Sequence, residues 1–171
     1  MKNSLIRTAI TAAVAATVLC GADSQKKSTV SDLMPLRPKL EEIKKTNADT
    51  SEVAYVATRC SALYAAMAFY LEDNNKDKKP EIEKSMLRFQ NDSVTFLKVS
   101  KILELLLLNK SEETLKKQQK LFLDIYSDEI AKGKLLNNNA ITPAIEEDVK
   151  CCNSVLSAYQ DLLENIGKDK K

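Results

Sequence analysis

Apolar residues recur at three- and four-residue spacing through most of the chain after residue 49. This spacing is typical of α-helices that bury one face. Polar connections divide it into four predicted helices, over residues 50–72, 80–109, 111–133 and 143–166. In the first, alanine and serine surround the apolar stripe, which indicates that neighbouring helices approach it on more than one side.

Local start and stop signals agree with these helices. Asp49 followed three residues later by Glu52 fits a capping box, and Thr142-Pro143 combines a capping residue with a favoured first helical residue. Gly133 is expected to end the third helix, because glycine is common just past a helix C-terminus. The asparagine-rich stretch 135–141 is then expected to form a loop.

The sequence therefore predicts an all-α protein, an antiparallel up-down four-helix bundle over residues 49–167. The chain contains only 3 glycines and 4 prolines, and it has no alternating strand pattern. Residues 23–48 are expected to form a polar leader and a short arm with a helix over 38–46, and 168–171 a charged tail. The apolar side chains of the arm should pack on the bundle; they are Leu33, Met34, Leu36 and Leu40.

Residues 1–22 have the pattern of a secretory signal peptide. Lys2 and Arg7 precede an uncharged stretch over 8–19, and small residues follow it. We therefore expect an exported protein, periplasmic or secreted, with no membrane span in the mature chain. An alternative makes Cys20 a lipid-attachment site, although the large Leu19 before it argues against that interpretation.

Charge and composition argue against several functions. Removal of residues 1–22 takes the basic residues from 26 to 24, against 24 acidic residues. This even balance, with both signs interspersed, disfavours nucleic-acid binding. The chain has no histidine, the commonest general base and transition-metal ligand, and no recognised catalytic or phosphate-binding motif. We expect no cofactor and no metal.

Three cysteines follow the predicted signal peptide. Cys60 lies mid-stripe in the first long helix, Cys152 mid-stripe in the last, and Cys151 at the edge of that stripe. The first and last helices of an up-down bundle are neighbours, and export favours disulfides. We predict a Cys60–Cys152 disulfide, with Cys60–Cys151 as the alternative pairing and free buried thiols as a further one.

A candidate partner surface comes from the second helix. Residues 102–108 are apolar nearly all round, because Leu106 and Leu107 are expected on the main buried stripe whereas Leu105 and Leu108 fall off it. Either the amino-terminal arm covers these two leucines, or they form an exposed patch for a partner or a second copy. Arg59 is expected to extend along the edge of the bundle, or to act as a surface charge flanked by Tyr55 and Tyr64.

The run Arg59-Cys60-Ser61-Ala62-Leu63-Tyr64, with a distant cysteine in the last helix, resembles short exported helical proteins of bacteria and their phages. The resemblance implies a helical body tied by a disulfide, and it implies no activity. We expect a non-enzymatic exported bundle that binds a protein or an envelope component. The alternatives are a small envelope hydrolase or inhibitor-type module with an unmarked site, and a protein anchored by lipid at Cys20.

Overall fold

The computed structural model describes residues 29–33, 35–45 and 49–168, and these ranges contain helices and no strand. The predicted all-α class is confirmed. The predicted signal peptide over 1–22, with Cys20, lies outside the described residues. So do residues 23–28 of the leader and 169–171 of the tail.

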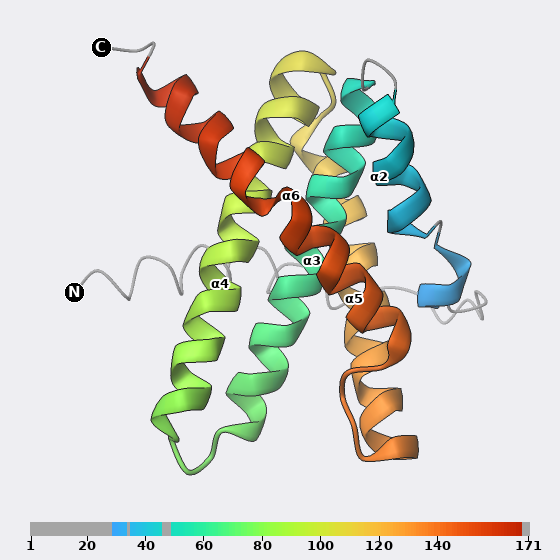
Figure 1. Cartoon of the computed structure of the whole chain (residues 1–171), viewed down its shortest axis with the longest axis vertical. Helices are drawn as coiled ribbons and strands as arrows, with labels where there is room; N and C mark the ends of the chain where they lie inside the picture. The colour runs from blue at the N-terminus through green and yellow to red at the C-terminus, as the bar shows by residue number, and fades with distance from the viewer. Residues whose placement is uncertain (1–28, 34, 46–48, 169–171) are drawn as a thin grey trace.

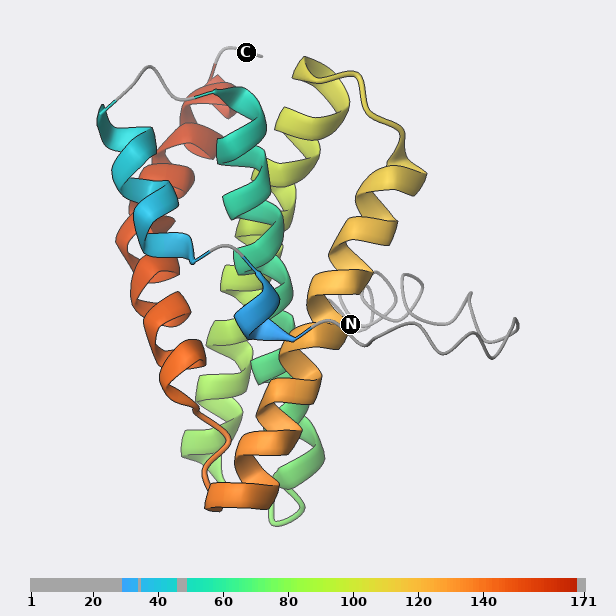
Figure 2. The same ribbon diagram turned by 90° about the vertical axis from the view of Figure 1, so that its right-hand side faces the viewer.

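Five α-helices and two short helical turns make up the described chain. In order they are the 3-10 helix η1 (Val30–Asp32), α2 (Leu36–Lys45), α3 (Thr50–Asn74), α4 (Pro80–Lys101), the π-helix η2 (Ile102–Leu107), α5 (Glu112–Asn137) and α6 (Pro143–Lys168). α3 and α4 lie side by side, and α6 crosses α3 obliquely (Figure 1). Figure 2 shows α2 against α6 and the start of α3.

The helices start where their polar caps predict. Asp49 accepts a hydrogen bond from the Ser51 amide at 3.0 Å and so caps α3. Glu52, expected to complete a capping box, instead forms an ion pair with Lys39 of α2. The Ser111 hydroxyl caps α5 by accepting from the Thr114 amide at 3.1 Å.

The end of α5 differs from the prediction. The helix continues past Gly133 to Asn137, and Asn138 ends it in the left-handed conformation with φ 50°. Gly133 has another role, because a Cβ there would lie 2.6 Å from the Asn139 carbonyl oxygen and from Thr142 Cγ2. Glycine is required at position 133 because the following connection folds back against α5 there. The prediction that Gly133 ends the helix was therefore wrong, since this residue serves the close approach and the helix ends at Asn137.

α3 is the central helix of the described chain. α2, α4, η2, α5 and α6 all contact it. Its middle is buried almost continuously, at Ala54, Val56, Ala57, Thr58, Arg59, Cys60, Ser61, Ala62, Leu63, Tyr64, Ala66, Met67 and Ala68. This confirms that its many small residues let neighbouring helices approach closely on several sides.

The amino-terminal arm packs on the body, as predicted. Leu36 and Leu40 of α2 are buried, and α2 contacts α3 and α6. The helix begins at Leu36, two residues before the predicted start at Pro38. Met34 lies outside the described residues.

A disulfide joins α3 to α6. Cys60 and Cys152 are bonded with an S–S distance of 2.08 Å and a Cα–Cα distance of 5.6 Å, in agreement with the preferred pairing. Cys151 is a buried free thiol, and burial raises its pKa. A raised thiol pKa leaves little reactive thiolate.

We expect the disulfide to contribute strongly to stability because it links residues 92 positions apart. The chain-entropy relation assigns a loop of that length about 4–5 kcal/mol. The Cys60→Ala/Cys152→Ala variant should lose about that free energy of unfolding, measured by urea denaturation, while Cys151→Ala should lose much less. Peptide mapping without reductant that linked Cys60 to Cys151 would contradict the pairing.

Candidate functional site

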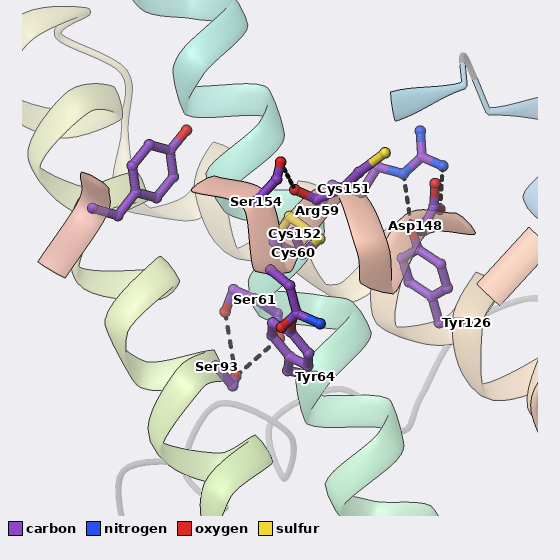
Figure 3. The surroundings of a disulfide bond; sticks show 12 residues. Arg59, Cys60, Ser61, Tyr64, Ser93, Tyr126, Asp148, Cys151, Cys152 and Ser154 are labelled. Carbon is purple, nitrogen blue, oxygen red and sulfur yellow. Dashed lines mark hydrogen bonds and ion pairs between the residues drawn. A yellow bond between two sulfur atoms is a disulfide. The ribbon is translucent and has the colours of Figure 1, made fainter. Parts of the chain in front are cut away.

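Arg59 is not at an edge of the molecule, and both predictions for it were wrong. Its side chain is 1% exposed. Position 59 lies in the enclosed middle of α3, so no direction leads its guanidinium to solvent. The structure places it beside the disulfide, pointing toward α5 and α6 (Figure 3).

Two neighbours compensate the buried guanidinium. Arg59 Nη2 donates to Asp148 Oδ2 at 2.6 Å, and Arg59 Nε donates to the Tyr126 hydroxyl at 2.7 Å. The Tyr126 hydroxyl in turn donates to Asp148 Oδ2 at 2.5 Å. Tyr55, predicted to flank Arg59 at a surface, is part-buried and accepts from Arg59 Nη1 at 3.3 Å. We call Arg59, Tyr126 and Asp148 the buried polar triad.

The charge states of the triad follow from this geometry. Burial would lower the pKa of the Arg59 guanidinium, but the combined attraction of Tyr126 and Asp148 outweighs burial and raises it. Burial also raises the pKa of the Tyr126 hydroxyl well above its usual value. Arg59 is therefore a cation and Tyr126 a neutral donor at neutral pH. The triad joins α3, α5 and α6, and all three of its side chains are buried.

The candidate partner surface lies on the π-helix η2, where the predicted register was wrong. Leu105 and Leu108 are only half-buried, whereas Leu106 is 71% exposed and Leu107 is 61% exposed. The prediction continued α-helical spacing through this stretch, and it therefore placed Leu106 and Leu107 on the buried stripe. A π turn takes in one more residue than an α turn, so it rotates the following side chains off that stripe.

The same π turn carries an unexpected buried acid, Glu104. Its side chain is 1% exposed, and its Oε2 lies 2.7 Å from Lys110 Nζ. This is an ion pair without hydrogen-bond alignment, and neither oxygen of the Glu104 carboxylate has a hydrogen-bond partner among the described residues. Sequence reasoning missed Glu104, because a single acid inside the apolar run 102–108 is as compatible with a solvent-facing position as with a buried one.

Glu104 lines a cleft of about 350 Å³. The cleft lies between α2, the first turns of α3, η2 and the start of α5. Its other lining residues are Lys39, Asp49, Ser51, Glu52, Tyr55, Lys110 and Gln118. We call it the Glu104 cleft. Charged and polar residues line it, and this distinguishes it from the exposed leucines that lie between Glu104 and Lys110 in the sequence.

The chain matches no protein-family model, no curated protein and no solved structure. Across the described ranges, no helix is both long enough and apolar enough to cross a membrane. Over the same ranges, no three or more carboxylate or thiol side chains are grouped closely enough to hold a metal ion. The geometry of the leucine surface and of the Glu104 cleft is therefore the basis for a functional proposal.

The triad predicts a large effect of removing its cation. In Arg59→Met the Asp148 carboxylate is left buried without its charge partner, and we expect a loss of about 3–5 kcal/mol in unfolding free energy. Urea denaturation measures this loss. Adding Asp148→Asn should recover part of it, because the double variant buries no charge.

Arg37→Met is the matched control, because Arg37 forms an exposed ion pair with Glu147, the residue before Asp148. It should leave the stability almost unchanged. Equal losses in the Arg37 and Arg59 variants would contradict the role given to the triad.

Proposed function

We propose that this chain is an exported, non-enzymatic helical protein that binds a protein of the cell envelope. The observation that carries the proposal is the exposure of Leu106 and Leu107, at 71% and 61%. Contiguous exposed apolar patches mark interaction surfaces, and the partly exposed Leu105 and Leu108 adjoin this pair in the chain. Their position on a π turn supports this, because such turns occur often at functional sites.

Export belongs to the same proposal. It rests on the signal-peptide pattern of residues 1–22 and is supported by the Cys60–Cys152 disulfide, since such bonds persist in oxidising compartments. The resemblance of residues 59–64 to short exported helical proteins of bacteria and phages is consistent with it. The disulfide and the buried polar triad join helices inside the protein, so we place binding at the surface.

We further propose that α3, α4, α5 and α6 form the antiparallel up-down four-helix bundle expected from the sequence. Their order and short connections support this arrangement. The contacts of α3 with the other three helices support it as well. The oblique path of α6 across α3 would then be a distortion of the bundle (Figure 1).

The leucine surface has a matched control elsewhere on the chain. Leu135 and Leu136 are also adjacent and exposed, at 87% and 67%, but they lie at the end of α5. We expect a photo-reactive residue at position 107 to crosslink an envelope protein in the native cell, and one at position 135 to crosslink none. Mass spectrometry then identifies the partner.

With that partner purified, Leu106→Asp/Leu107→Asp should weaken binding at least tenfold, because interface leucines would be replaced by charges that must be desolvated. Leu135→Asp/Leu136→Asp should bind like the parent protein. Equal affinity of the two double variants would refute the proposed surface. Crosslinking of position 107 to a second copy of this chain would replace the envelope partner with a homodimer, and light scattering would show it.

A further inference from the structure

We infer that the Glu104 cleft is a binding site for a primary ammonium group, a function separate from the leucine surface proposed above. The inference rests on a buried carboxylate that is incompletely satisfied, in a cleft with space beside it. Glu104 is 1% exposed, and its Oε1 has no hydrogen-bond partner among the described residues. An ionised carboxylate accepts several hydrogen bonds, so a further donor would be stabilising.

The charges that line the cleft favour a cation. Three carboxylates, those of Asp49, Glu52 and Glu104, face two ammonium groups, those of Lys39 and Lys110. Counting these five groups as ionised leaves one negative charge in excess. An incoming monocation would balance that charge, whereas an anion would be repelled.

The other two acids are already engaged. Asp49 caps α3, and its hydrogen bonds from Ser51 lower its pKa. Glu52 is paired with Lys39. The unfilled capacity for a hydrogen-bond donor therefore lies at Glu104, whose Oε1 has no hydrogen-bond partner among the described residues. Less than 1 Å² of either oxygen is exposed, so the ligand would reach the carboxylate by displacing the Lys110 side chain, which is itself 38% exposed.

Because Lys110 lies beside only Oε2, the single oxygen without a neighbouring cation favours an ammonium over a guanidinium. A guanidinium binds a carboxylate best through two parallel hydrogen bonds, which require both oxygens. Lys110 Nζ already lies 2.7 Å from Glu104 Oε2. A primary ammonium is compact and needs only one acceptor in line.

The ligand chemistry is thus an alkylammonium, and two sources carry it: a free small amine, or a lysine side chain of a protein. A volume of about 350 Å³ accommodates either a four-carbon amine or the end of a lysine side chain. Asp92 is another buried carboxylate with an unpartnered oxygen, but it does not line this cleft, and it faces Arg88 at 3.6 Å.

The test is a calorimetric and NMR titration of the purified full chain with its disulfide intact. The probes are 1-aminobutane and the capped tripeptide Gly-Lys-Gly, and their neutral counterparts are butan-1-ol and capped Gly-norleucine-Gly. We expect saturable binding of an amine and none of its neutral counterpart. Binding of the free amine alone would identify a small-molecule ligand, and binding of both amines would include a protein lysine.

Two substitutions at one ion pair should act in opposite directions. Glu104→Gln should weaken amine binding at least tenfold, because the acceptor loses its charge. Lys110→Met should strengthen binding about tenfold, because it removes the competing cation. Glu113→Gln is the control, since it makes the same charge change at an exposed pair with Lys117 and should leave binding unchanged.

The absence of saturable binding to the parent chain would overturn the inference, and so would equal affinity of the Glu104→Gln and Glu113→Gln variants. If Glu104→Gln fails to fold, the effect of Lys110→Met on amine affinity decides between a binding site and a purely structural ion pair. A binding site predicts tighter amine binding in that variant, whereas a purely structural pair predicts weaker or unchanged binding. Leu106→Asp/Leu107→Asp should retain amine binding, so failure of the leucine surface and failure of this cleft are separate results.

Discussion

The enclosure of α3 governs the chemistry of the helices around it. A helix with neighbours on all sides has no polar face for its charged residues, so Arg59 must find its counter-charge inside the protein. Asp148 of α6 provides the charge, and the neutral hydroxyl of Tyr126 of α5 provides a further hydrogen-bond acceptor. The neighbours of α3 therefore provide complementary charge as well as apolar packing.

The triad and the disulfide act at the same place on α3 by different physics. Cys60 follows Arg59 in the chain, and both reach α6, one through a covalent bond and the other through an ion pair (Figure 3). The covalent link limits the entropy of the unfolded chain. The ion pair selects one arrangement of α3 and α6, because any other would leave a charge buried alone.

Away from this centre, the π turn η2 places two different chemistries next to each other. The widened turn brings Glu104 into the body and leaves Leu106 and Leu107 outside. A regular α-helix over the same residues would have buried the leucines with the rest of the stripe. The departure from regular geometry therefore creates both the exposed apolar surface and the acid of the cleft.

Features that depend on residues close together in the chain were predictable. Helical class and most helix starts follow from apolar spacing and capping residues, which act within one or two turns. The predicted Cys60–Cys152 pairing combined this spacing, which placed both cysteines mid-stripe, with the expectation that the first and last helices of a bundle are neighbours. The end of α5 was predicted wrongly because the glycine at position 133 is required by the close approach of Asn139 and Thr142, which lie beyond the helix, and not by the helix end itself.

Tertiary structure alone decided the burial of Arg59, the register of η2 and the existence of the Glu104 cleft. Arg59 and Asp148 are 89 positions apart, and no local pattern relates them. A charged residue within an apolar stripe is compatible with an exposed edge or with a buried pair. The choice depends on whether a partner helix brings an opposite charge to the same depth, which the packing of the whole chain determines.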